Sequence, residues 1–144
     1  MPGGDKPTRL KATAIRDGGQ FRHTIQVRDH SLTVDERLTG GGTDAGPDPQ
    51  ELLAVSLASC TAITMEMYAA RKGWDIGRVE VEVEYTPADR GCPTKFELIM
   101  RFPEDVPEEQ VERLRAIAAK CPVHRALDGE VMFNERIQRV HMAA

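Results

Sequence analysis

The sequence predicts an α+β fold in which antiparallel strands surround one long, apolar central helix. Three observations on the 144 residues support it. Short runs of alternating apolar and polar residues, separated by turn signals, indicate strands near the N-terminus. Strict alternation over residues 78–85 indicates a further strand. Strong helix-start signals at Asp48 precede an apolar run of helical length. With no internal repeat, residues 1–144 are predicted to form a single domain.

Residues 9–34 are predicted to form a three-stranded antiparallel meander. Leu10, Ala12 and Ala14 alternate with polar residues, and Asp17-Gly18-Gly19 is a turn signal. The run 21–27 follows, and polar residues 28–31 separate it from Leu32 and Val34. The glycine-rich stretch 39–47 lacks the lysine and the spacing of a phosphate-binding loop, so we expect a flexible connector there.

The central helix is predicted from residue 49 to about Lys72. Asp48 is a favourable N-cap, Pro49 suits the first helical position, and Glu51 completes a capping box with Asp48. Gly73 is a favourable residue for ending the helix.

Apolar residues of this helix point in nearly every direction, which indicates a buried helix or a membrane span. Polar residues interrupt it too often for a membrane span, at Ser56, Ser59, Thr61, Thr64 and Glu66. One small chain has difficulty covering a helix of this length. The pattern therefore predicts a homodimer and no membrane partner.

The remaining elements alternate between strand and helix. Val79, Val81, Val83 and Tyr85 share one face of the strand 78–85, and residues 95–102 are its predicted partner. A second helix should start near Pro107 and end at Cys121, because Pro122 disfavours helical geometry at the residue before it. A short turn at residues 123–127 and a last strand around residues 130–140 complete the prediction.

Composition and charge limit the partners and the location expected for this protein. Lysine and arginine total 19 against 23 acidic residues, a net charge of −4, which gives no reason to expect a nucleic-acid partner. Residues 1–11 lack the apolar stretch of a secretory signal, so a cytoplasmic location is expected. Three cysteines, an odd number, argue against a secreted disulfide framework.

The cysteines differ in context. Cys60 lies mid-helix, where packing is the usual role and where a basic residue from elsewhere is needed to form a thiolate. Cys121, at the predicted helix end, forms Cys-x-x-His with His124; without a second such pair, a zinc site is disfavoured. Cys92 lies in a loop, is expected to be exposed, and has no evident role.

Four segments together resemble the OsmC/Ohr family of peroxide-reducing proteins. They are GPDPQELL at 46–53, LASCTA at 57–62, YAARKG at 68–73 and IAAKCPVHRAL at 117–127. The order of the predicted elements also agrees with that family over nearly the whole chain.

The resemblance implies an OsmC-like fold, an intertwined homodimer and active sites at the dimer interface. It implies that Cys60 is the peroxidatic cysteine and Cys121 the resolving cysteine, acting on organic hydroperoxides with an external dithiol as reductant and no cofactor or metal. In this chemistry a thiolate is oxidised to a sulfenic acid and then forms a disulfide.

The family also uses an arginine from the first hairpin and a glutamate near the start of the cysteine helix. Arg22, just after the turn, matches the arginine best, and Arg16 is the alternative. The family glutamate orients this arginine, and its position is occupied here by Gln50. Glu51 follows one residue later and is the candidate for that role, with the capping box as its alternative role. This departure favours a branch related to OsmC over a strict Ohr-type enzyme.

Two other functions are compatible with the sequence. One is a non-catalytic dimeric module that binds a small molecule in an apolar interface pocket. The other is a zinc-binding domain that uses Cys121 and His124.

Overall fold

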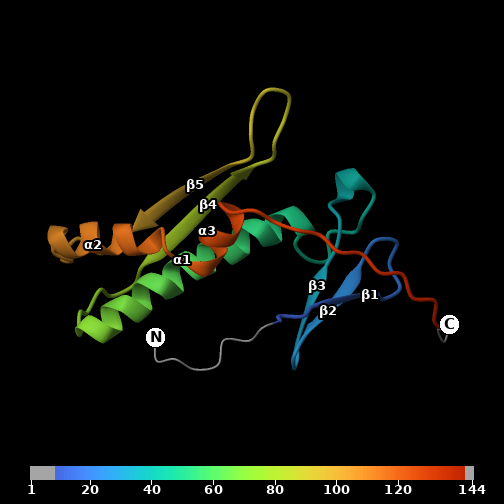
Figure 1. Cartoon of the computed structure of the whole chain (residues 1–144), viewed down its shortest axis with the longest axis horizontal. Helices are drawn as coiled ribbons and strands as arrows, with labels where there is room; N and C mark the ends of the chain where they lie inside the picture. Colours follow the sequence, from blue (N-terminus) through green and yellow to red (C-terminus); the bar gives the residue numbers. More distant parts are fainter. Residues whose placement is uncertain (1–8, 142–144) are drawn as a thin grey trace. The chain divides into compact units, whose positions relative to one another are not determined.

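The computed structural model describes residues 9–141 (Figure 1). Residues 1–8, which form most of the stretch examined for a leader sequence, and residues 142–144 lie outside the described residues. The chain forms two compact units. The first comprises the described residues up to Ser56 and Val83–Leu98, and the second comprises Leu57–Glu82 and the described residues from Ile99 onward.

The first unit contains a three-stranded antiparallel sheet, as predicted. Its strands β1 (Thr13–Arg16), β2 (His23–Val27) and β3 (His30–Val34) pair in sequence order. Arg16 pairs with His23, and Val27 pairs with His30. The second turn is therefore limited to Arg28 and Asp29. It is shorter than the predicted polar break, because His30 and Ser31 already pair with β2.

The loop after β3 is ordered around one buried carboxylate, so the expectation of a flexible connector was wrong. Asp35 is 2% exposed. Its Oδ2 accepts hydrogen bonds from the Thr43 hydroxyl at 2.6 Å, the Thr43 N–H at 3.2 Å and the Ala45 N–H at 3.1 Å. Its Oδ1 accepts from the Glu36 N–H at 2.7 Å. These bonds hold the loop, which includes the short 3₁₀ turn η1 (Leu38–Gly40), against the end of β3.

Two glycines permit this close packing. A Cβ atom at Gly42 would lie 2.1 Å from the Glu36 carbonyl oxygen, and one at Gly46 would lie 2.3 Å from that of Thr33. Both distances are far below van der Waals contact. The glycines of the connector therefore allow backbone segments to approach each other, rather than supplying flexibility.

Replacing Asp35 by Ala is expected to destabilise the protein by about 3 kcal/mol, because four part-buried hydrogen bonds to its carboxylate are lost at ~1 kcal/mol each. Thr43→Val, which removes one of these bonds, should cost about 1 kcal/mol. Urea denaturation at neutral pH measures both. Equal stability of Asp35→Ala and the wild type would show that these bonds do not hold the loop.

Asp35 also makes the free energy of unfolding depend on pH, so that the protein is less stable in acid. Hydrogen bonds from Thr43, Ala45 and Glu36 lower the pKa of Asp35 from 3.8 to about 2 in the folded protein. Its contribution is therefore complete above the unfolded-state pKa and is lost as the pH falls from about 4 toward 2. Asp35→Asn should lose less stability than the wild type over this range.

The central helix α1 (Pro49–Lys72) has the bounds predicted from its capping signals. The Glu51 N–H donates to Asp48 Oδ1 at 2.7 Å, and the Asp48 N–H donates to Glu51 Oε1 at 3.0 Å. These two bonds form the capping box. At the other end Gly73 has a φ of 71°, and the Trp74 N–H donates to the Ala69 carbonyl at 2.9 Å. Gly73 therefore ends the helix in a left-handed conformation.

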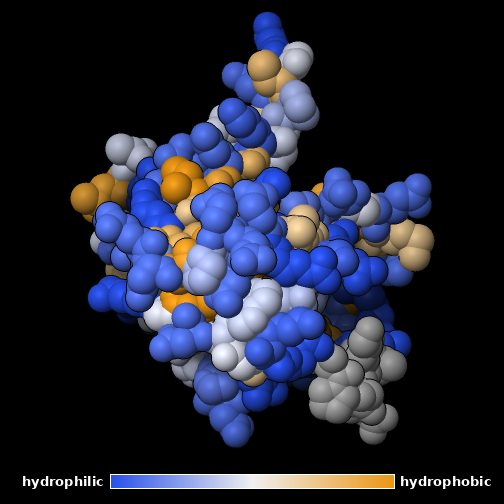
Figure 2. Space-filling model, turned by 90° about the vertical axis from the view of Figure 1, so that its left-hand side faces the viewer, coloured by the Kyte–Doolittle hydropathy of each residue, from blue (hydrophilic) through white to orange (hydrophobic). Residues whose placement is uncertain are grey.

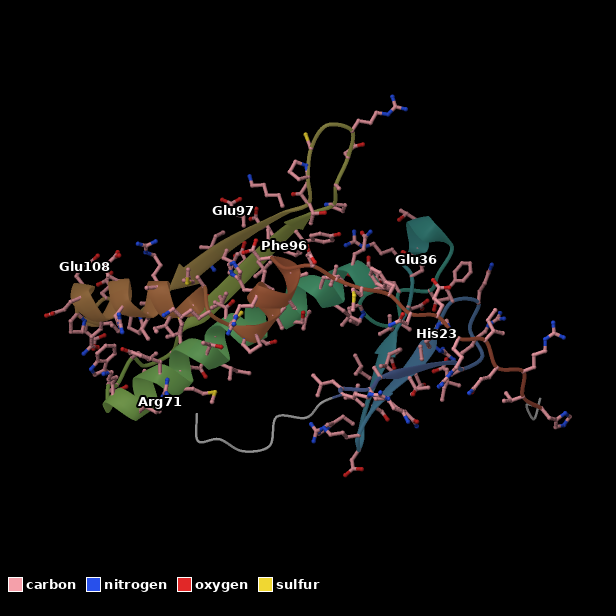
Figure 3. All side chains as sticks on the ribbon, viewed as in Figure 1. His23, Glu36, Arg71, Phe96, Glu97 and Glu108 are labelled. Atoms are coloured by element: carbon pink, nitrogen blue, oxygen red, sulfur yellow. The ribbon has the colours of Figure 1, made fainter. Side chains whose placement is uncertain are left out.

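The hairpin predicted for residues 78–102 is also present. Strands β4 (Glu80–Thr86) and β5 (Lys95–Arg101) pair with each other. The glutamates of β4 are exposed and its apolar residues are half-buried, which matches the predicted alternation. On β5, half-buried Phe96 precedes exposed Glu97, as adjacent strand residues face opposite sides (Figure 3). Phe96 stacks on Tyr85 with ring centres 4.9 Å apart.

The second unit contains a hydrophobic core. In this core, α1 from Leu57 onward packs against α2 (Glu108–Ala118) and against residues of the segment that connects the two helices. The buried members of this core are Met65, Tyr68, Ala69, Ile76, Val106, Leu114 and Ala118. The helix α3 (Pro122–Leu127) follows α2 after a short break.

Three predictions for the C-terminal third were wrong. The second helix ends at Ala118, and Cys121 is the N-cap of α3 rather than the last residue of α2. Pro122 suits the first turn of a helix as well as it ends one, so the turn predicted for residues 123–127 is helical instead. Residues 130–140 form no strand, because no strand within the described residues pairs with them.

The face of the molecule shown in Figure 2 is mainly hydrophilic, with apolar residues visible between polar ones. Of the described helices, α1 alone is long and apolar enough to cross a membrane, with a mean hydropathy of 1.4 over its most apolar window. The core helix of a soluble protein passes the same test. The burial of Leu57, Thr61, Met65, Tyr68 and Ala69 in α1 agrees with a core helix.

Candidate dithiol site

The structure brings Cys60 and Cys121 together in the second unit. Cys60 lies midway along α1 and is half-buried, whereas Cys121 at the start of α3 is 0% exposed. The Cys60 thiol hydrogen bonds to the Cys121 side chain, and both cysteines are reduced. Two cysteines 61 positions apart in sequence are thus neighbours.

Local hydrogen bonds fix the position of Cys121. Its Sγ accepts from the His124 N–H at 3.3 Å, which caps the first turn of α3. The buried hydroxyl of Thr61 lies 3.9 Å from the same sulfur and donates to the Leu57 carbonyl at 2.7 Å. Thr61, next to Cys60 in the sequence, therefore connects α1 with the sulfur of Cys121.

Burial raises the pKa of the Cys60 thiol above its ordinary value of 9.0. Hydrogen bonding to Cys121, which favours the protonated form, raises this pKa further. The backbone N–H of Val123 and the hydroxyl of Thr64 act in the opposite direction. None of these groups is a cation. A reactive thiolate requires a nearby positive charge, which these groups do not supply.

Neither a metal site nor a role for Cys92 emerges from the described residues. In residues 9–141 no three side chains of His, Cys, Asp or Glu are grouped as metal ligands. The group between His124 and Cys121 is a backbone N–H, so the imidazole is not part of that bond. Cys92 is exposed in the β4–β5 loop, as expected, where its N–H and carbonyl both bond to Asp89.

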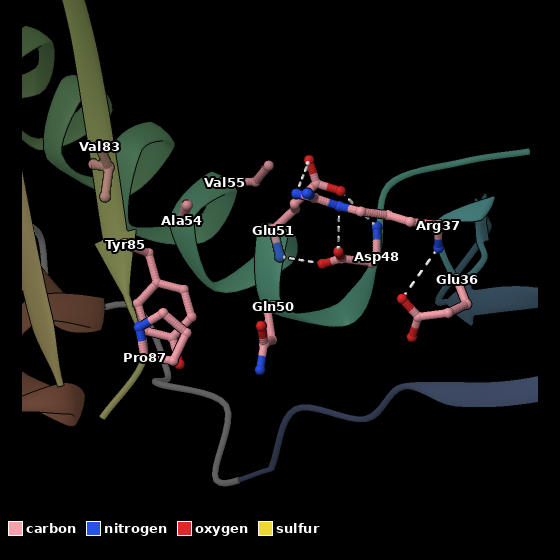
Figure 4. Close-up of a pocket in the computed structure, with 10 residues that line it drawn as sticks. All are labelled: Glu36, Arg37, Asp48, Gln50, Glu51, Ala54, Val55, Val83, Tyr85 and Pro87. Carbon is pink, nitrogen blue, oxygen red and sulfur yellow. Dashed lines mark hydrogen bonds and ion pairs between the residues drawn. The ribbon is translucent and has the colours of Figure 1, made fainter. Parts of the chain in front are cut away.

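A second polar cluster lies in the first unit, at the start of α1 (Figure 4). Arg37 Nε lies 3.0 Å from Asp48 Oδ2, and its NH2 group lies 3.5 Å from Glu51 Oε2. The arginine thus binds both carboxylates of the capping box. A cavity of about 670 Å³ adjoins this cluster, and Val83 and Tyr85 form part of its apolar wall.

Arg37 is a residue that the sequence analysis missed, and it is the arginine that Glu51 contacts. Arg22, the arginine chosen from sequence, instead pairs with Asp17 at 2.7 Å across its own turn. Arg16 Nε donates to the Gly19 carbonyl at 3.1 Å. Gln50 lines the same cavity as Arg37 and Glu51. The only sequence signal for Arg37 is its place just before the glycine-rich loop that returns to the helix start.

A small α+β fold with two neighbouring thiols defines the chain as a dithiol protein. The family model of the OsmC-like proteins matches residues 41–136, two thirds of the chain, which include Cys60 and Cys121. The chain belongs to the OsmC-like protein family. A comparison with curated protein sequences found no significant match.

Solved structures with the same fold include an OsmC-like protein from Mycoplasma pneumoniae. It has a TM-score of 0.71 and 20% identity, with 88% of this chain and 90% of that chain covered. The organic hydroperoxide resistance protein OhrB of Bacillus subtilis has a TM-score of 0.57 and 23% identity, with 84% of this chain and 91% of that chain covered. An organic hydroperoxide resistance protein OsmC from Legionella pneumophila has a TM-score of 0.61 and 20% identity, with 86% of this chain and 93% of that chain covered. These similarities establish the fold.

Proposed function

We infer that this protein reduces organic hydroperoxides to alcohols, with Cys60 as the peroxidatic cysteine and Cys121 as the resolving cysteine. The observation that carries this proposal is the hydrogen-bonded contact between the two thiols. Membership in the OsmC-like family supports it, as do the similar folds of organic hydroperoxide resistance proteins. A single domain with a cytoplasmic location is part of the same proposal.

The reaction is balanced with one external dithiol. The Cys60 thiolate attacks the terminal oxygen of the peroxide and breaks the O–O bond, which releases an alcohol and leaves a sulfenic acid. The Cys121 thiol then attacks the sulfur of that sulfenic acid, forms a disulfide and releases water. A dithiol reduces the disulfide by exchange and is itself oxidised. Cys121 lies beside Cys60, which suits the second step.

The first step requires a cation, because burial raises the pKa of Cys60. The family resemblance assigns this role to an arginine, and Arg22 remains the prediction from sequence. Arg37 is a further candidate, because it pairs with Glu51, the carboxylate predicted to orient the arginine. This pairing supports Glu51 over Gln50 as the orienting residue.

Three variants identify the arginine. The variant that removes it should raise the pKa of Cys60 and slow peroxide attack at pH 7 about tenfold or more, since one pKa unit changes the thiolate fraction about tenfold. Thiolate absorbance during a pH titration and stopped-flow oxidation measure the two effects. Arg22→Ala, Arg37→Ala and Arg16→Ala are compared, with Arg16→Ala expected to have the smallest effect. A Cys60 pKa unchanged in all three would contradict activation by an arginine from this region.

An alkyl hydroperoxide should react faster than hydrogen peroxide. Ile63 and Met67 follow Cys60 by three and seven positions on one face of α1, and they are 53% and 45% exposed. An alkyl chain on this surface gains about 0.8 kcal/mol per CH₂ removed from water. Two or three carbon atoms thus favour the alkyl substrate about tenfold. Stopped-flow rate constants for cumene hydroperoxide and hydrogen peroxide test the proposal, and equal values would contradict it.

A homodimer completes the proposed active enzyme. Much of the apolar surface of α1 is exposed in the single chain, including Leu53, Val55, Ile63 and Met67. The segment after α3 is also apolar and exposed, with Phe133 at 85% and Ile137 at 91%. Several large apolar side chains exposed on one helix are typical of an interface with another protein surface. A second copy of the chain is the partner that the helix pattern predicts.

A further inference from the structure

The last two turns of α1 contribute to a cluster of cations around one buried tyrosine. Tyr68 is 8% exposed, and its hydroxyl accepts a hydrogen bond from Arg113 Nε of α2 at 2.9 Å. The charged groups of Arg71, Lys72 and Arg113 lie 5.7, 5.6 and 5.7 Å from the centre of the Tyr68 ring. Arg71 is labelled near the end of α1 in Figure 3.

These three cations have no acidic partner in the part of the chain that the structure describes. The ion pairs of residues 9–141 do not include Arg71, Lys72 or Arg113, although Arg115 on the same helix pairs with Glu112 at 3.1 Å. The dipole of α1 favours Arg71 and Lys72 in its last turn. It does not account for Arg113, which comes from α2 and is held in place by the Tyr68 hydroxyl.

The same four residues form the wall of a cavity. A hollow of about 360 Å³ is lined by Tyr68, Arg71, Lys72 and Arg113. Its wall therefore carries three positive charges and a hydroxyl that already accepts a hydrogen bond. This cavity shares no residue with the cysteine pair or with the Arg37 cluster.

We propose that this cavity binds a phosphate group. Guanidinium groups bind phosphate through two parallel N–H···O bonds, and a lysine adds a compact positive charge. Arg113 uses its Nε on Tyr68, which leaves both of its terminal NH₂ groups for a ligand. Three cations match a dianion better than a monoanionic carboxylate. An anion in direct contact with the lining cations would be little screened from them, because contact distances are shorter than the ~8 Å screening length at physiological salt.

Isothermal titration calorimetry on the full chain tests the site. Inorganic phosphate is the first probe and pyrophosphate the second, with ionic strength held constant by sodium chloride. We expect saturable binding of one phosphate per chain, tighter for pyrophosphate. Arg71→Gln and Arg113→Gln should each weaken binding tenfold or more. Arg115→Gln is the matched control, because it removes an arginine of α2 that does not line the cavity. The affinity of this variant for phosphate should equal that of the wild type.

Three results would overturn the proposal. The first is no binding of either probe above the sodium chloride background. The second is an equal loss of affinity in Arg115→Gln, which would indicate a general charge effect. The third is unchanged affinity in Arg71→Gln and Arg113→Gln when both retain the wild-type circular dichroism spectrum. Phenyl phosphate then distinguishes the natural source: tighter binding than inorganic phosphate supports an organic ester at this site, and weaker binding supports free phosphate.

Discussion

Cys60→Ser is expected to abolish the reduction of organic hydroperoxides, with a loss of at least about three orders of magnitude, as for other removed nucleophiles. The thiolate is the attacking group, and a serine hydroxyl at this place in α1 is not ionised at neutral pH. The substitution is nearly isosteric and half-buried, so the fold should be preserved. Coupled consumption of a dithiol with cumene hydroperoxide measures the loss, and circular dichroism checks the fold.

Cys121→Ser should give a different defect. The first attack on peroxide should continue, so one equivalent of hydroperoxide is consumed, and a sulfenic acid then accumulates on Cys60. A dimedone label detected by mass spectrometry reports this species. Cys92→Ser is the matched control, because Cys92 is exposed in the β4–β5 loop, and it should cycle at the wild-type rate.

The same experiment separates the enzyme from its non-catalytic alternative. A binding module of this fold would consume no peroxide, and oxidation would produce no reversible disulfide between Cys60 and Cys121. Mass mapping of the oxidised protein therefore decides between the two functions. A disulfide that joins Cys92 to either of the other cysteines would contradict the assigned roles.

Local chemical signals predicted the regular elements well. The bounds of α1 follow from Asp48, Glu51 and Gly73, whose capping interactions involve residues close in sequence. The hairpin β4–β5 follows from strict alternation, which requires only that one face be covered. Such signals need no knowledge of distant contacts, and for this reason they are legible in a single sequence.

Distant contacts explain what the sequence analysis missed. The loop 39–47 is ordered by Asp35, whose partners Thr43 and Ala45 lie eight and ten positions away, and composition does not reveal such bonds. Arg37 contacts Asp48 and Glu51 only because that loop returns to the start of α1. The contact of Cys60 with Cys121 was expected from the family resemblance, since spacing alone does not bring two helices together.

The missing strand at residues 130–140 has the same kind of cause. A strand needs a neighbour to receive its N–H and C=O groups, and the described chain offers none to this segment. Its apolar residues remain exposed, including Met132 at 87%. Alternation in a sequence indicates the capacity to pair, whereas the partner strand is supplied by the fold or by another chain.

Two substitutions on α1 should have large and different effects on assembly. Leu57 is 2% exposed, and Leu57→Glu buries an unpaired charge, which should unfold the chain. Ile63, six positions later, is 53% exposed in the single chain. Ile63→Glu should therefore leave the chain folded and convert the dimer into a monomer, because the charge is buried only when a second copy covers this surface.

Light scattering at micromolar concentration, together with far-ultraviolet circular dichroism, measures both effects. The wild type should be a dimer, Leu57→Glu should lose its helical signal, and Ile63→Glu should keep that signal at half the mass. Ala116→Glu is the control, since it places the same charge on an exposed position of α2. A monomeric wild type would remove the dimer from the proposed function. A dimeric Ile63→Glu variant would instead place the interface away from this part of α1, and the exposed segment around Phe133 would be the next surface to charge.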